Sequence, residues 1–378
     1  MKEVPGESNR IVDKVLAYRP QSKSNVGEIM AFDYKHYVPV LKGKRAEFPS
    51  LGALKSKTDL TPLIEAVPSV SVTEIPKRMS TSWPKGSQYF IDFVFLDDPD
   101  NEGKANAKHP LMVCFADVAA KAQLAVPVTG LSRSPVYQSA VSQIAGTQKH
   151  GIAVRLTADD FEDDADELEE ALTALLNYCH LSPNETDLLV DLGSVADGSA
   201  GQVAQSHRSN LDLLPSLDDW RTLTVVAGAF PLSMAQLTRD EWNERNRHDW
   251  RGWRLLVTGK RPPKRLPSYG DYTIAHPNLP PTGRATILAQ LRYTVENAWL
   301  IWKGWNVFTH PDGYDQFYAI CADLVKSSDF LGADFSSGDQ EIAEKATNSG
   351  SSGNAESWRR IATTHHLEMV LAQIANLP

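Results

Sequence analysis

Six charged residues lie within or directly after short apolar runs, where a charge is costly to bury unless it is paired or bound to a ligand. They are Lys42, Glu65, Asp92, Arg155, Asp191 and Asp271. If these side chains meet, the bases can hold a phosphate or carboxylate group. The acids can work as general acid and base or bind a divalent cation, although no particular metal or cofactor is indicated. We therefore predict a mixed-charge site with Glu65, Asp92, Asp191 and Asp271 as catalytic candidates and Lys42 and Arg155 as ligand-binding residues.

The same charges have a structural alternative. Ion-pair networks also gather charged residues within strands, so the set could form a buried salt-bridge layer that binds nothing. The sequence leaves both possibilities open.

Other ligand-binding candidates lie close to these runs. Lys44 follows Lys42 in the same turn, and Tyr272 follows Asp271. Arg292 and Tyr293 end a later predicted strand, from which they could cap the site. These four residues extend the predicted ligand-binding set.

A loop rich in glycine and hydroxyl side chains spans residues 332–341 and leads into a helix start. Free backbone N–H groups at such a start bind anions, so we include Ser336, Gly338 and Asp339 as ligand-binding candidates. The alternative is that Ser337 or Asp339 serves only as the N-cap of the helix.

The last predicted helix contains two adjacent histidines, His365 and His366. Adjacent helical residues point about 100° apart, so the pair cannot bind one metal ion, and we expect one to face inward and the other outward. His365 is the ligand-binding candidate. A buried, hydrogen-bonded histidine is the alternative.

Eight short apolar runs predict the strands that would position these residues. They cover residues 37–41, 63–64, 89–95, 124–128, 152–155, 188–192, 223–227 and 269–274. Stretches of helical length separate most of them, for example residues 109–122, 136–149, 161–179 and 233–257. This alternation favours a closed (β/α)8 barrel, in which strand ends form the functional face. The competing doubly wound sheet is less suitable because the first turn lacks a G-x-G-x-x-G motif.

The pattern changes after residue 285. Residues 286–293 and 299–305 predict a β-hairpin, and residues 314–326 and 355–376 predict helices. We therefore expect an N-terminal arm over residues 1–34, a barrel over 35–284, and a hairpin with helices over 285–378 that packs on the barrel within the same domain.

Composition limits the partners. The formal net charge is −9, from 47 acids and 38 bases, and residues 159–170 alone hold nine acids without a base. Broad coating of nucleic acid therefore does not fit, while a local basic site does. Three widely spaced cysteines indicate a reducing compartment. The first residues lack a signal-peptide core, and no apolar run is long enough for a membrane span, so we expect a soluble cytoplasmic protein.

Several short segments, in this order, resemble the bacterial and phage "Beta protein" family. They are residues 37–47, 61–65, the strand ending at Arg155, 187–193, 230–231, 269–272, 332–339, 353–358 and 364–366. The resemblance spans residues 35 to 377. It implies a barrel of this class, an association with mobile elements, and a role in phage defence or phage–host conflict. It implies no catalytic residues.

Two functional hypotheses follow. In the first, the barrel binds a phosphate-bearing ligand, a nucleotide or a nucleic-acid end, and possible chemistry at the rim is hydrolytic. In the second, the chain is a non-catalytic recognition module whose partner is a phage protein or a component of a defence system. A structural interaction protein with an internal salt-bridge layer is a third reading.

Overall fold

The computed structural model of the chain describes residues 29–97, 109–162, 164–280 and 286–377. Eight parallel strands close into a barrel in the order β1-β2-β3-β4-β5-β6-β7-β9. Their bounds are β1 (Tyr37–Leu41), β2 (Leu63–Glu65), β3 (Gln88–Asp92), β4 (Leu124–Thr129), β5 (Ile152–Leu156), β6 (Thr186–Ser194), β7 (Thr222–Gly228) and β9 (Ser268–Asp271). Each coincides with a predicted run, so the (β/α)8 barrel is confirmed.

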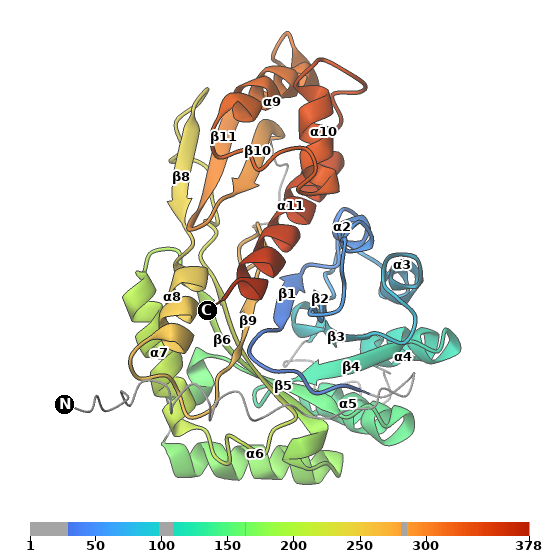
Figure 1. Cartoon of the computed structure of the whole chain (residues 1–378). Coiled ribbons are helices and arrows are strands. Elements are labelled where there is room, and N and C mark those ends of the chain that lie inside the picture. The colour runs from blue at the N-terminus through green and yellow to red at the C-terminus, as the bar shows by residue number, and fades with distance from the viewer. Residues whose placement is uncertain (1–28, 98–108, 163, 281–285, 378) are drawn as a thin grey trace, which may run out of the picture.

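Helices cover the outside of this barrel (Figure 1). They are α2 (Glu47–Gly52), α3 (Glu74–Ser82), α4 (Pro110–Ala120), α5 (Pro135–Gln148), α6 (Ala165–Cys179), α7 (Ala200–Leu213) and α8 (His248–Thr258). Their ends follow from local chemistry. For example, α5 begins with a proline after Ser134, whose hydroxyl accepts a hydrogen bond from the Tyr137 N–H, and it ends at Lys149 in a left-handed conformation.

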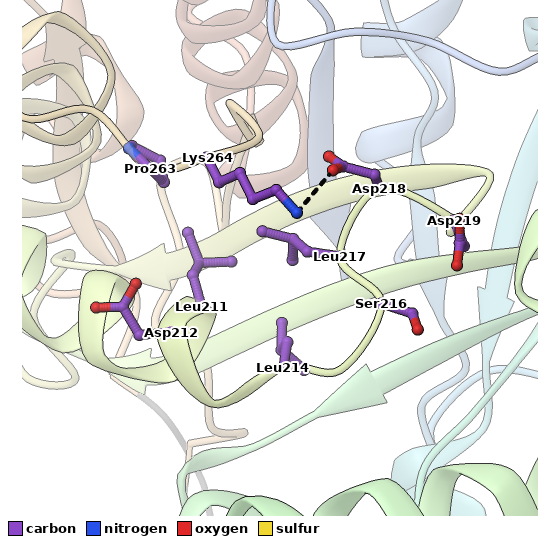
Figure 2. A pocket seen from close by; sticks show the side chains of 9 residues that line it. All are labelled: Leu211, Asp212, Leu214, Ser216, Leu217, Asp218, Asp219, Pro263 and Lys264. Carbon is purple, nitrogen blue, oxygen red and sulfur yellow. Dashed lines mark ion pairs between the residues drawn. The ribbon is translucent and has the colours of Figure 1, made fainter.

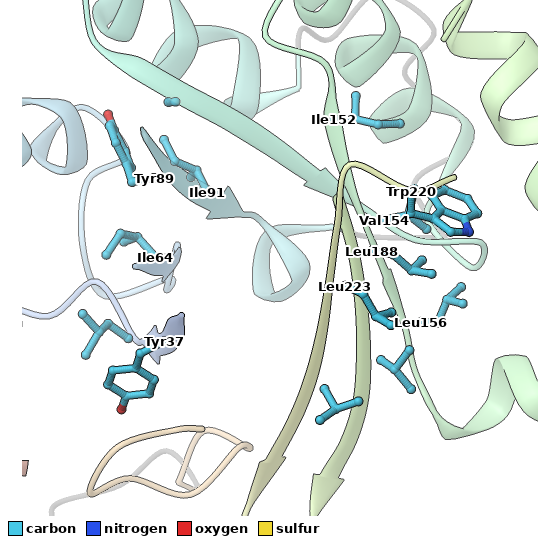
Figure 3. Close-up of a cluster of buried hydrophobic side chains, with 14 of the residues drawn as sticks. Tyr37, Ile64, Tyr89, Ile91, Ile152, Val154, Leu156, Leu188, Trp220 and Leu223 are labelled. Atoms are coloured by element: carbon cyan, nitrogen blue, oxygen red, sulfur yellow. The ribbon is translucent and has the colours of Figure 1, made fainter. Parts of the chain in front are cut away.

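Side chains alternate along each strand between the inside of the barrel and the helices. The inner layer includes Val38, Leu63, Phe90, Val126 and Leu189. The outer layer packs beneath the helices, and Figure 3 labels members of it such as Tyr37, Ile64, Ile91, Val154 and Leu188. This alternation decides which polar residues at the strand ends can meet inside the barrel.

A second sheet lies beyond the barrel mouth, with strand order β10-β11-β8, all pairs antiparallel (Figure 1). We call it, with its three helices, the extension. Its elements are β8 (Trp242–Asn246), β10 (Leu288–Thr294), β11 (Ala298–Asn306), α9 (Gln316–Lys326), α10 (Ser337–Lys345) and α11 (Ala355–Ala375). The predicted hairpin and both predicted C-terminal helices are found.

The predicted helix over residues 233–257 is wrong in its first half. Residues 242–246 form β8, which pairs with β11 through contacts such as Trp299 with Arg245 and Ile301 with Asn243. This pairing joins segments more than fifty residues apart, which no local periodicity reveals. The extension thus takes one strand from the segment assigned to the barrel, and the predicted division into 35–284 and 285–378 stays a prediction. Most of the predicted arm lies outside the described residues.

Helix α11 connects the extension to the barrel, running from the extension past β1 toward α8 (Figure 1). The Ser50 hydroxyl on α2 donates to the carbonyl oxygen of Arg360 at 3.2 Å, and the Lys55 N–H donates to Glu368 at 2.6 Å. Within the described part of the chain, no helix has both the length and the apolar character that crossing a membrane requires.

Gly338 lies where the backbone of α10 packs tightly against that of α11. A Cβ atom there would lie 2.5 Å from the carbonyl oxygen of Ile361, whereas a Cβ at Gly146 on α5 would meet nothing within 4 Å. We expect Gly338→Ala to lower the free energy of unfolding by about 1 to 3 kcal/mol, because backbone must move to admit the methyl group. Gly146→Ala should raise it by about 0.5 to 1 kcal/mol through helix propensity. Urea unfolding of both variants checks this, and equal effects would contradict it.

Candidate functional site at the barrel rim

Six of the predicted residues meet at the carboxyl ends of the strands. Strand alternation turns Lys42, Glu65, Asp92, Arg155, Asp191 and Tyr272 toward the inside of the barrel, above the inner apolar layer. Together with Arg133, they form what we call the rim network. Glu65 and Asp92 are neighbours in the pairing of β2 with β3, so two carboxylates lie side by side. Two neighbouring carboxylates repel each other, so a cation is needed to stabilise the pair.

Arg155 supplies that cation. Its Nη1 donates to Glu65 Oε1 at 2.9 Å and to Asp92 Oδ2 at 2.7 Å. Its Nε and Nη2 donate to Asp191 Oδ2 at 2.9 and 2.6 Å, and Nη2 also bonds the Tyr272 hydroxyl, which in turn donates to Asp191. One guanidinium therefore connects β2, β3, β5, β6 and the residue after β9.

Two further cations complete the rim network. The Lys42 ammonium donates to Glu65 and to the carbonyl oxygen of Pro277, and it lies 4.6 Å from the centre of the Phe95 ring. Arg133 Nη2 donates to Asp92 Oδ1 at 3.1 Å. Three cations thus face three carboxylates, and the charges balance. Arg133 was missed by the sequence analysis, although its place just after β4 satisfies the same strand-end rule as the other rim residues.

The side chains of the rim network are buried or nearly buried, and they are bonded to one another in this structure. Asp92 is fully buried, and Arg155 is only 7% exposed. Burial disfavours the Asp92 carboxylate, but the charges of Arg133 and Arg155 outweigh it and hold the pKa of Asp92 below its usual value. The Asp92 carboxylate is therefore ionised and paired, as the structural alternative predicts. The catalytic roles of Glu65, Asp92 and Asp191 stay predictions.

Asp271 does not join the rim network, so the expected convergence of all six charges is wrong. It lies on the outer side of β9, because Tyr272, the next residue, points inward. Its carboxylate accepts hydrogen bonds from the hydroxyls of Tyr37 and Tyr269 at 2.6 and 3.1 Å and lies 2.9 Å from His366 Nε2 on α11. Strict alternation along the sequence already excludes Asp271 and Tyr272 from the same face.

Both histidines of α11 are buried, which contradicts the expectation that one faces outward. His366 connects Asp271 with the Thr294 hydroxyl, which lies 2.9 Å from Nδ1. His365 lies 2.9 Å from Asp339 Oδ2 and 2.7 Å from the carbonyl oxygen of Thr294. Both ring nitrogens of His365 thus lie within hydrogen-bond distance of an oxygen atom. The bonds of His366 join the barrel to the extension, and those of His365 hold α11 within the extension. We call the group formed by His365, His366, Asp271, Thr294 and Asp339 the junction network.

The predicted anion loop belongs to this junction network. Ser336 is the N-cap of α10, and the Asp339 carboxylate accepts hydrogen bonds from the hydroxyls of Ser336 and Tyr293. Asp339 is fully buried and already supplies the negative charge at this helix start. The structure therefore places Tyr293, Ser336, Gly338, Asp339 and His365 in the packing of the extension, away from the rim network. Their ligand-binding role stays a prediction.

Three other cations lie at the barrel mouth, and we call Lys44, Arg292 and Arg359 the mouth cations. They come from the turn after β1, from β10 and from α11. Burial lowers the pKa of Lys44, and the charges of Arg359, Lys42 and Arg292 lower it further against the opposing effect of Glu47. Burial and then Arg359 lower the pKa of Arg292. Arg359 was missed because nothing in its local sequence indicates which elements it meets.

A surface cavity of about 340 Å³ lies at the opposite, amino end of the barrel (Figure 2). Asp212, Asp218, Asp219 and Lys264 line it together with leucines, and Lys264 forms an ion pair with Asp218 at 3.1 Å. None of the rim residues contributes to this cavity. Among the described residues, no group of three or more His, Cys, Asp or Glu side chains is arranged to hold a metal ion.

Comparison with known proteins identifies the family. A family model described as "Beta protein" matches residues 37–372, most of the chain, and confirms the resemblance seen in the sequence. No curated protein matches the chain. Among solved structures, triosephosphate isomerase from Bartonella henselae is similar over 52% of this chain and 84% of that chain, with a TM-score of 0.31 and 12% sequence identity.

We expect Arg155→Met to lower the free energy of unfolding by about 3 to 5 kcal/mol at pH 8, because three buried carboxylates lose their shared partner. Without Arg155 the pKa of Asp92 should rise, so the loss should shrink at pH 5, where the orphaned carboxylates can take up protons. Urea unfolding at both pH values measures this. The control Arg254→Met removes an exposed ion pair with Glu296 and should cost less than about 1 kcal/mol. A rim variant as stable as that control would refute the central role of Arg155.

We expect a second effect of pH on stability from Asp249, which lies on α8 next to the junction network. Burial and then the Asp271 charge raise the pKa of Asp249 to about 7. A raised carboxyl pKa favours the protonated form in the folded state, so stability should fall as the pH rises from about 4 to about 7. Asp249→Asn should therefore stabilise the protein at pH 8, by on the order of a few kcal/mol, and much less at pH 4. The exposed control Asp212→Asn should change little at either pH, and a pH-independent effect of Asp249→Asn would contradict the raised pKa.

Proposed function

We propose that this chain, which belongs to the Beta protein family, binds a phosphate-bearing ligand at the mouth of its barrel. The observation that carries the proposal is the contrast between two sets of cations. Each cation of the rim network is paired with a carboxylate. No ion pair joins the mouth cations to a carboxylate within the described ranges of the chain, although Glu47 lies near enough to affect Lys44 and Arg359.

Electrostatics favours an anion at this place. Clustered cations raise each other's free energy, and each of Lys44 and Arg292 has a lowered pKa as a result of burial and of the neighbouring charge of Arg359. An anion bound among them would reverse that effect. Guanidinium groups also match the geometry of phosphate oxygens, which accept two parallel hydrogen bonds from one fork.

The proposal extends to hydrolysis of the bound ligand. The nearest acids are those of the rim network, where Glu65, Asp92 and Asp191 all accept hydrogen bonds from Arg155. To act on a ligand, one of these carboxylates would have to exchange Arg155 for a water molecule or a divalent cation. The closed, balanced rim network thus favours the second candidate, a recognition module that binds without turnover.

For the biological role, we propose phage defence or phage–host conflict, as the family resemblance implies. The alternative to a phosphate-bearing ligand is a protein partner, either a phage protein or a component of a defence system. The cytoplasm is the proposed compartment. In its support, Cys114, Cys179 and Cys321 are all free and buried, which suits a reducing environment.

Thermal unfolding of the full chain tests the binding proposal. We expect inorganic pyrophosphate and nucleoside triphosphates to raise the unfolding midpoint, because a ligand at a hundredfold excess over its Kd adds about 2.7 kcal/mol. Lys44→Ala should abolish most of the rise, whereas Lys85→Ala, far from the mouth on the loop after α3, should retain it. If no phosphate compound shifts the midpoint at low salt, the proposal fails.

The same samples separate an enzyme from a recognition module. Phosphate release that disappears in Asp191→Asn while binding persists would favour hydrolysis. Binding without any release, with or without Mg²⁺, would favour recognition. A plaque assay with Lys44→Ala would then show whether the site matters for phage growth.

A further inference from the structure

We infer that the mouth cations form a site for the dianionic phosphate of a phosphomonoester, held jointly by the barrel and the extension. This inference rests on the proposed function and deepens it, because it specifies the charge of the ligand and the two parts of the fold that hold it.

The barrel side of the site is a tight turn. Gly43 has a φ of +64°, and a Cβ atom there would lie 2.9 Å from the carbonyl oxygen of Glu65. This glycine lets the chain turn directly over β2, so that Lys42 points into the rim network and Lys44 stands at the mouth. The Lys44 N–H donates to Glu47 Oε2 at 3.1 Å, which fixes the turn to the start of α2.

The extension side brings two arginines to this turn. Arg292 on β10 donates through Nε and Nη2 to Gln290 Oε1 at 3.1 and 2.8 Å, and through Nη1 to the carbonyl oxygen of Ile274 at 2.7 Å. Ile274 lies in the same loop as Pro277, whose carbonyl accepts from Lys42. Its guanidinium also lies 4.8 Å from the centre of the Phe230 ring. These contacts hold Arg292 against the barrel loop after β9.

Arg359 reaches the mouth through the first turns of α11. On one side of it, Glu356 approaches Arg45 at 3.8 Å, and on the other, the Arg360 carbonyl accepts from Ser50 on α2. Both flanking contacts lie on the segment that follows β1, so Arg359 is carried to the turn that holds Lys44. The side chain of Arg359 is partly exposed and thus open to a ligand from solvent.

The local charge selects the ligand. Glu47 is the carboxylate whose charge acts on Lys44 and Arg359, whereas Arg45 is matched with Glu356 and Arg360 with Glu341. Counting Lys44, Arg292 and Arg359 against Glu47 leaves two positive charges. A phosphomonoester carries about −1.5 to −2 near neutral pH, so it neutralises this surplus, whereas a phosphodiester with a single negative charge leaves half of it.

Titration calorimetry on the full chain at pH 8 and low salt tests this assignment with methyl phosphate and dimethyl phosphate, which differ by one charge and one methyl group. We expect methyl phosphate to bind at least about tenfold more tightly, because it gains charge-assisted hydrogen bonds from a second arginine. Arg359→Gln should weaken methyl phosphate by about tenfold or more and dimethyl phosphate much less. Arg254→Gln on α8 removes the same charge elsewhere and should change neither, and thermal unfolding without ligand verifies that both variants fold.

The outcomes distinguish the inference from the proposed function. Equal affinity for the two esters, both weakened by Lys44→Ala, would overturn the dianion site and leave phosphate binding intact. No binding of either ester or of inorganic phosphate would overturn both. If methyl phosphate is preferred, comparison of a nucleoside monophosphate with a 5′-phosphorylated oligonucleotide identifies the source of the phosphomonoester.

Discussion

The rim of this barrel depends on one guanidinium. The register of β2 with β3 sets the carboxylates of Glu65 and Asp92 side by side, and Asp191 approaches from β6. Three buried acids at such distances would repel each other and resist folding. Arg155 on β5 lies between them, bonds all three, and leaves the Tyr272 hydroxyl to close the ring of hydrogen bonds. The polar end of the barrel can close because this cation is present.

A second constraint acts where the extension meets the barrel. His366 of α11 bonds Asp271 of β9 and Thr294 of β10, so a single side chain joins the barrel to the second sheet. His365 pairs with Asp339 and holds α10 against the same helix. Because these groups are buried and fully bonded, the extension is positioned with little freedom. The contact of Arg292 with the barrel loop after β9 follows from that attachment.

Much of the architecture could be predicted because it is encoded locally. Short apolar runs separated by helical stretches gave all eight barrel strands, and the strand-end rule then brought Lys42, Glu65, Asp92, Arg155, Asp191 and Tyr272 together. The errors have separate physical origins. Asp271 was included against strict alternation, whereas β8 was assigned to a helix because its partner β11 is distant in the chain. The loop at Ser336 was expected to take an external anion, but Asp339 fills that place.

What the sequence by itself determined is the kind of fold and most of the charged residues at its strand ends, since periodicity and strand ends are local properties that each segment carries alone. Only the tertiary structure decided which charges cancel. Arg155 pairs with three acids, whereas among the described residues no ion pair joins Lys44, Arg292 or Arg359 to a carboxylate. The physical reason is that pairing energies depend on distances of a few ångströms between side chains from separate elements, and these distances are set only when the barrel closes and the extension docks on it.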